Sequence, residues 1–167
     1  KVNPVCAPND WEKRFHYLWR FWQHIPTPGE IAVFDRTWYG RVLVERVEGF
    51  ATVNEWRRAY QEINDMEKQW TKQNIIVQKF WMQIDKEEQY NRFKAREEDP
   101  DKTWKITAED WRNREKWDSY VEAINEMLYR TDTEEAPWTV VEAKNKFYAR
   151  LKVMETMIKR MSRALEK

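Results

Sequence analysis

The stretch from Gly29 to Phe50 constrains the fold of this chain more than any other. A turn rich in proline and glycine, 26–29, is followed by a short apolar run, 31–34, which ends abruptly on Asp35 and Arg36. Such a run is typical of a buried parallel strand, and ligands of open α/β sheets bind at the carboxyl ends of the strands. We therefore expect Asp35 to lie where a carboxylate can hold a metal ion bound to phosphate. The alternative is a strand that ends in a solvated Asp-Arg pair.

Further strands and helices alternate along the chain. The patterns predict strands at 2–6, 75–84 and 138–141, and helices at 11–22, 53–70 and 85–98, one that begins after Thr107, and one at the C-terminus. On the last helix six apolar residues are expected to face inward: Tyr148, Leu151, Met154, Ile158, Met161 and Leu165. This alternation predicts an α/β/α layered domain with a parallel sheet.

Length and charge exclude several classes of protein. The 167 residues suit one domain, and a net charge of +1 with 35% charged residues gives no basic excess of the kind that nucleic-acid binding needs. A polyanion site must therefore be a local cluster. The single cysteine excludes an internal disulfide, and we see neither a membrane span nor a signal peptide, so a reducing, cytoplasmic location is expected.

Several tryptophan-rich motifs occur together in this chain. The residues after the predicted strand read Asp35-Arg36-Thr37-Trp38-Tyr39, and the chain also contains HYLWRFW at 16–22, EWRRAYQEIND at 55–65, DWRNREKW at 110–117 and APWTVVEA at 136–143. In type and order these motifs resemble the polyphosphate kinase 2 family, and within it most of all the polyphosphate:AMP phosphotransferase branch. The resemblance covers nearly the whole chain.

The resemblance implies a P-loop kinase-like, three-layer α/β/α fold over residues 1–167, with a helical lid at about 86–128. The three glycines, at 29, 40 and 49, include no G-x-x-x-x-G-K pattern, the Walker A loop that cradles phosphates. By resemblance, then, the sheet is incomplete, because the first strand, the Walker A loop and the first helix are absent. A missing central strand would leave unpaired backbone groups on both neighbours. We expect the isolated chain to be poorly soluble, to borrow a strand in a homo-oligomer, or to associate with the missing N-terminal segment.

The resemblance also implies an activity: transfer of a terminal phosphoryl group between inorganic polyphosphate and AMP, ADP or a related nucleotide, with Mg²⁺. Asp35 and Arg36 would be catalytic, with Asp35 holding Mg²⁺ through phosphate or water. Lys146 would contact the nucleotide. The remaining cations would bind phosphate or polyphosphate: Arg41, Arg92, Arg96, Lys102, Lys105, Arg112 and Arg114.

Alternatives to these roles remain open. Arg41 could instead pair with Glu45 or Glu48, and the lid cations could belong to a solvated, salt-bridged face. Two loops depart from the family pattern, at Thr103 in the lid and at Asn145 and Phe147 near the nucleotide. These departures and the missing Walker A loop favour a second hypothesis, an inactive, degenerate or truncated copy of the domain that serves assembly.

Overall fold

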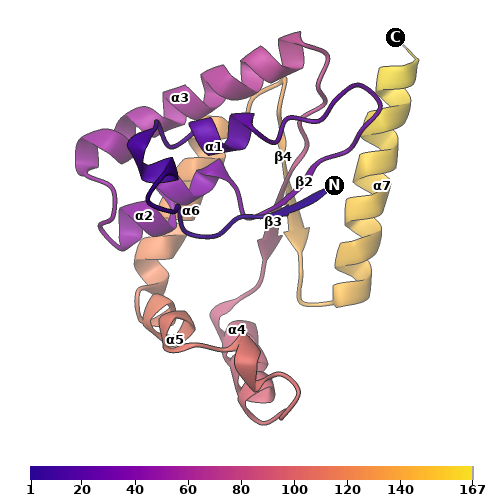
Figure 1. The fold of residues 1–167 in the computed structure, drawn as a ribbon. Helices are drawn as coiled ribbons and strands as arrows, with labels where there is room; N and C mark the ends of the chain where they lie inside the picture. Colours follow the sequence, from indigo (N-terminus) through magenta and orange to yellow (C-terminus); the bar gives the residue numbers. More distant parts are fainter. Residues whose placement is uncertain (167) are drawn as a thin grey trace.

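The computed structural model describes residues 1–166 and shows an α/β fold with parallel strands (Figure 1). The strands are β1 (Val2–Pro4), β2 (Val33–Asp35), β3 (Lys79–Gln83) and β4 (Trp138–Glu142). The helices are α1 (Trp19–Trp22), α2 (Val44–Val47), α3 (Val53–Lys72), α4 (Lys86–Glu97), α5 (Ala108–Glu115), α6 (Trp117–Thr131) and α7 (Lys146–Leu165). Short 3₁₀ helices lie at Glu12–Arg14, Trp38–Val42 and Thr103–Lys105. None of the helices within residues 1–166 has the length and apolar composition that crossing a membrane requires.

The strands form two parallel pairs. Strand β1 pairs with β2, with Pro4 opposite Asp35, and β3 pairs with β4, with Lys79 opposite Trp138. The parallel direction agrees with the sequence analysis, but within residues 1–166 the two pairs are separate two-stranded sheets and not one sheet.

Helix α3 organises the larger hydrophobic core. A capping box begins it, with Thr52 accepting from the Glu55 amide and Glu55 accepting from the Thr52 amide. Its apolar stripe, which includes Ile63 and Met66, packs in one cluster with residues of α1, the 38–42 segment and α6. A smaller cluster lies under α7, where Val141 and Ala143 meet Ala149. Helices therefore cover both faces of the β3–β4 pair.

The expected helix at 11–22 is broken. Only Glu12–Arg14 and Trp19–Trp22 are helical, and Phe15 between them is extended with ψ 168°. Aromatic side chains lose rotamer freedom in a helix. Here Phe15 stacks on Trp19, with ring centroids 4.2 Å apart.

Two expected strands are shorter or more exposed than predicted. The strand at 75–84 is limited to Lys79–Gln83 because β4 offers a partner to these residues alone. Asn74 before it adopts φ 63°, a left-handed conformation that asparagine tolerates better than most residues. Strand β2 is not buried: Val33 is 47% exposed, because β1 is its one partner strand among the described residues.

The two C-terminal helical segments also differ from expectation. The helix after Thr107 stops at Glu115 and restarts at Trp117, because Lys116 leaves helical geometry with ψ 23°. On α7 the face expected inward points outward, with Leu151 63% and Ile158 58% exposed, and Tyr148, Met154, Met161 and Leu165 exposed with them. The small Ala149 lies against β4 instead.

Candidate functional site

Strand β2 delivers Asp35 to a sharp turn. The Asp35 carbonyl accepts a hydrogen bond from the Val5 amide (2.9 Å), which fixes the end of the strand. The Asp35 carboxylate is exposed and makes no hydrogen bond or ion pair within residues 1–166. Arg36 follows with φ 65°, a left-handed conformation that is rare for a residue with a side chain. Thr37 then accepts from the Tyr39 amide (3.3 Å) and begins the 3₁₀ helix.

A buried polar network lies directly behind this turn. Glu67 of α3 accepts from the Trp38 indole nitrogen (3.0 Å) and the Tyr39 hydroxyl (2.7 Å), and pairs with Lys79 (2.8 Å). Burial raises the pKa of the Glu67 carboxyl, an effect that the nearby Lys79 ammonium opposes, and burial lowers the pKa of Lys79.

The sequence analysis missed both charged residues of this network. The signal for Glu67 was its place on the helical stripe of Ile63, Met66 and Trp70, where a carboxylate is out of pattern.

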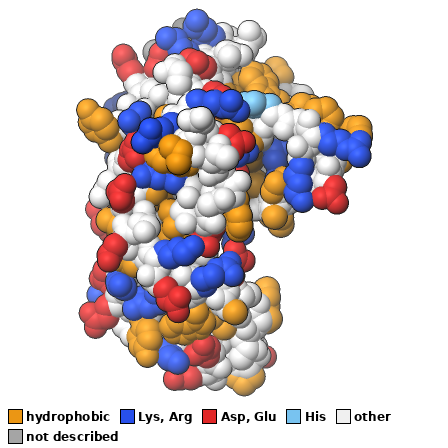
Figure 2. Space-filling view, turned by 90° about the vertical axis from the view of Figure 1, so that its left-hand side faces the viewer, with side chains coloured by type: hydrophobic (Ala, Val, Ile, Leu, Met, Phe, Trp, Pro, Cys, Tyr) orange, Lys and Arg blue, Asp and Glu red, His pale blue; other side chains and the backbone are white. Residues whose placement is uncertain are grey.

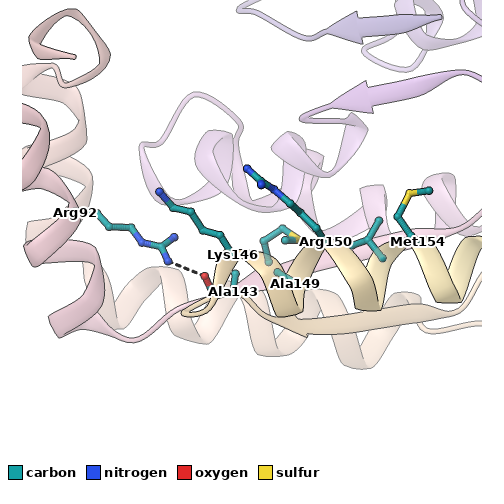
Figure 3. A pocket seen from close by; sticks show the side chains of 8 residues that line it. Arg92, Ala143, Lys146, Ala149, Arg150 and Met154 are labelled. Carbon is teal, nitrogen blue, oxygen red and sulfur yellow. Dashed lines mark hydrogen bonds between the residues drawn. The ribbon is translucent and has the colours of Figure 1, made fainter. Parts of the chain in front are cut away.

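A hollow of about 400 Å³ lies beside the end of β4, and Figure 3 shows its lining. It is lined by Met82, Arg92, Ala143, Lys146, Ala149, Arg150, Val153 and Met154. Lys146 and Arg150 lie one turn apart on α7, and their side chains project to the same side of the helix (Figure 3). A second hollow, which also involves Lys144 and Phe147, shares Arg92 and Lys146.

Arg92 is held in place on this hollow. Its Nε donates to Glu88 (2.7 Å), and one terminal nitrogen donates to the carbonyls of Ala143 (2.7 Å) and Lys144 (3.0 Å). The guanidinium of α4 is therefore tied to the carboxyl end of β4. Three cations from two helices converge here, an arrangement suited to anionic oxygens such as those of phosphate.

The other predicted phosphate-binding residues do not line this hollow. Those on α4, on α5 and in the loop between them belong to a projection that extends away from the strands (Figure 1). Lys102 pairs with Asp99, Lys105 lies over the Trp104 ring at 4.9 Å, and Arg112 is 3.6 Å from Glu48. Arg114 donates to the Lys86 carbonyl (2.5 Å), while Arg96 makes no ion pair within residues 1–166.

The two candidate arginines that follow Asp35 differ: Arg41 is engaged inside the fold and Arg36 is not. Arg41 pairs with Glu45 (3.2 Å) and lies over the Tyr17 ring at 4.4 Å, as the salt-bridge alternative predicted. Arg36 makes no ion pair with any described residue and is exposed. Basic and acidic side chains are interspersed over the face shown in Figure 2, in agreement with the balanced charge.

Side chains that could bind a metal ion are few at the Asp35 turn. Within residues 1–166 no group of three or more His, Cys, Asp or Glu side chains could hold a metal. Mg²⁺ at kinase sites is commonly bound by one or two carboxylates together with substrate phosphates and waters. The single exposed carboxylate of Asp35 fits that mode and would not fit an ion caged by protein ligands alone.

The model of the polyphosphate kinase 2 family matches residues 1–167. The chain belongs to the polyphosphate kinase 2 family. It is 56% identical over 156 residues to the polyphosphate:AMP phosphotransferase of Pseudomonas aeruginosa, covering 93% of this chain and 32% of that protein. It is 42% identical over 154 residues to NDP-polyphosphate phosphotransferase 2 of Ruegeria pomeroyi, covering 92% of this chain and 45% of the relative.

A solved family structure has the same fold. The crystal structure of polyphosphate kinase 2 from Arthrobacter aurescens TC1 superposes with a TM-score of 0.93 at 39% identity, over 96% of this chain and 57% of that one. The present chain thus spans about a third to a little over half of the length of these family members.

Proposed function

We propose that the full-length protein containing this chain transfers a terminal phosphoryl group between inorganic polyphosphate and a nucleoside mono- or diphosphate, with AMP as the first candidate acceptor. One observation carries the proposal: Asp35 and Arg36 lie unpaired in a strained turn at the carboxyl end of β2, the edge of a parallel sheet where ligands bind. The relatives that this chain matches are named for polyphosphate and for AMP or NDP.

The residues of this chain act by positioning and by neutralising charge, as in phosphoryl transfer generally. Arg36 would bind the transferring phosphoryl group, and Asp35 would orient the phosphates and hold Mg²⁺ through phosphate or water. When bound, Mg²⁺ neutralises phosphate oxygens at that carboxylate. Arg92, Lys146 and Arg150 would hold the phosphate chain or the nucleotide phosphates in the hollow at the end of β4.

The helical projection from α4 through α6 would serve as the lid. Its cations Arg96, Lys102, Lys105, Arg112 and Arg114 lie on or between α4 and α5. Lys102 pairs with the nearby Asp99, whereas Arg112 and Arg114 contact Glu48 and the Lys86 carbonyl, and phosphate would have to replace these partners. Closure of a lid excludes water and brings basic side chains over the transferring group. Polyphosphate would then lie between the lid and the strands.

We further propose that a strand and Walker A loop supplied by the rest of the protein complete the sheet between β2 and β3. Two features support this: the two parallel pairs are separate sheets, and the outward face of α7 is apolar from Tyr148 to Leu165, which leaves room for further elements of the protein. A P-loop kinase site needs the backbone amides and the lysine of a Walker A loop, and the 167 residues contain no G-x-x-x-x-G-K pattern. The relatives are named as phosphotransferases and give no support to the alternative of an inactive copy, so we do not propose it.

The proposal is tested with the full-length protein, by measuring ADP formed from AMP and polyphosphate. We expect Asp35→Asn to lower kcat by about a hundredfold or more, because the metal-binding charge is lost while the shape is kept. The matched control is Asp65→Asn, an exposed carboxylate on α3, which should retain activity within about twofold. Equal activity of both variants would refute the proposed role of Asp35.

A further inference from the structure

A buried ion pair lies behind the Asp35 turn, and the function proposed above assigns it no role. The side chains of Glu67 and Lys79 are 1% and 4% exposed, and they come from different elements, α3 and β3. Both are more buried than any cation on the hollow or in the lid.

Every polar atom of this pair is used. The Lys79 ammonium donates to Glu67 (2.8 Å), to the Tyr39 hydroxyl (2.9 Å) and to the Thr131 carbonyl (2.6 Å). Glu67 accepts from Lys79 with one oxygen and from Trp38 and Tyr39 with the other. The network thus joins α3, β3 and the end of α6 to the residues that follow the turn.

An ion pair in such a place is a weak way to stabilise a fold. Desolvation of two charges offsets most of their attraction, and apolar residues of the same volume are often as stable. An apolar pair could fill this space, but it could not bind the indole nitrogen of Trp38 and the hydroxyl of Tyr39. The specific effect of Glu67 and Lys79 is therefore to fix the orientation of these two side chains.

Trp38 and Tyr39 in turn restrain the backbone just before them. Arg36 is held at φ 65°, and such strained conformations persist where the surrounding structure over-determines them. Strand β2 precedes this strained residue and is fixed by the hydrogen bond from the Val5 amide to the Asp35 carbonyl. Trp38 and Tyr39 follow it and are only 6% and 3% exposed. The turn is thus clamped at both ends.

We propose that Glu67 and Lys79 are positioning residues, which fix the turn at Asp35 and Arg36 by holding the side chains of Trp38 and Tyr39. The proposal rests on the function proposed above, in which that turn carries the reacting phosphates. Both side chains are buried away from the surface, so their loss should change the rate of transfer more than the affinity for AMP or polyphosphate.

The test compares two buried tyrosines in the full-length protein. Tyr39→Phe removes the hydroxyl that links Glu67 and Lys79 to the turn. Tyr60→Phe is the matched control, because Tyr60 is also 3% exposed and its hydroxyl also bonds a charged group, Arg46 (2.9 Å), away from the turn. Two quantities are measured: kcat and KM with AMP and polyphosphate, and amide hydrogen exchange of residues 35–39.

We expect Tyr39→Phe to lower kcat about tenfold with KM within about twofold, and to speed exchange at 35–39, while Tyr60→Phe changes neither. Equal kcat and equal exchange in the two variants would overturn the proposal. If Tyr39→Phe does not fold, the double variant Glu67→Leu/Lys79→Met replaces it with the same readouts and control, because an apolar pair fills the space and no longer binds the indole nitrogen of Trp38 or the hydroxyl of Tyr39.

Asp35→Asn in the same assay separates this proposal from the proposed function. Full activity of Asp35→Asn would refute the function, and the exchange rates would then decide the positioning role alone. Loss of activity in Asp35→Asn with unchanged kcat in Tyr39→Phe would refute only the positioning role.

Discussion

Replacement of Lys79 by methionine should destabilise the protein far more than the small change in side-chain volume suggests. Methionine keeps the unbranched, apolar part of the side chain and removes the ammonium, which makes three hydrogen bonds in a site where the side chain is 4% exposed. The variant leaves the Glu67 carboxylate buried, with Trp38 and Tyr39 as its neutral donors.

The magnitude follows from the asymmetry of buried ion pairs. Removal of one partner costs about 3–5 kcal/mol, because the other charge is left without compensation. In the double variant Glu67→Gln/Lys79→Met no charge remains, and the glutamine oxygen can still accept from Trp38 and Tyr39. We expect the double variant to lose about 1 kcal/mol or less.

The loss in Lys79→Met should also depend on pH. Burial already raises the pKa of Glu67, and without the opposing Lys79 charge the pKa rises further above its ordinary value. A carboxyl whose pKa is higher in the folded than in the unfolded state binds more protons when folded, so stability is lost as the pH rises through the folded pKa. Lys79→Met should therefore be less stable at pH 8 than at pH 5, relative to the wild type.

Urea unfolding of the full-length protein at pH 5 and pH 8, followed by tryptophan fluorescence, measures these differences. The double variant is the control, because it has no titratable group at the site and should show the wild-type change with pH or a smaller one. A loss of about 1 kcal/mol or less in Lys79→Met, or an equal loss in the double variant, would refute the reasoning.

Three further predictions concern single contacts. Arg92→Lys should raise KM for polyphosphate or for AMP about tenfold in steady-state assays, since a single ammonium cannot bind the Ala143 and Lys144 carbonyls and also present donors to the hollow; two unchanged KM values would remove Arg92 from the site. Thr52→Ala should lower the free energy of unfolding by about 1 kcal/mol, through loss of the α3 cap; denaturant melts in which it matches the wild type would count against the cap. Asn74→Ala should cost about 1 kcal/mol and Asn74→Gly close to nothing in the same melts, because φ is 63°; the reverse order would contradict the left-handed turn.

Local signals in the sequence predicted much of the fold. The helices predicted at 53–70, at 85–98 and after Thr107 begin at the expected residue or one later, because each start depends on a cap and a partner three positions apart. The parallel direction of the strands followed from their alternation with helices. The break at Lys116 was not predictable in this way, since its ammonium pairs with Glu48 of a distant segment (2.8 Å).

The outward face of α7 shows why apolar periodicity alone misleads. Leu151 and Ile158 recur at helical spacing, yet the face that meets β4 carries the small Ala149. Periodicity identifies an apolar face but not the element that covers it.

Sequence reasoning placed only part of the candidate site. It singled out Asp35 and Arg36 because a motif follows a strand, and the structure places two of the other cations that it singled out, Arg92 and Lys146, on one hollow. It missed Glu67 and Lys79, because their partners lie 28 and 40 positions away at Tyr39 and are joined only by folding.

The most direct test of the central claim follows a labelled terminal phosphoryl group from polyphosphate to AMP in the full-length protein. We expect label in the β-phosphate of ADP with the wild type and with Asp65→Asn, and transfer that is slower by about a hundredfold or more with Asp35→Asn. Undiminished labelling with Asp35→Asn, or no labelling with the wild type, would contradict the assignment of phosphoryl transfer to the turn at Asp35 and Arg36.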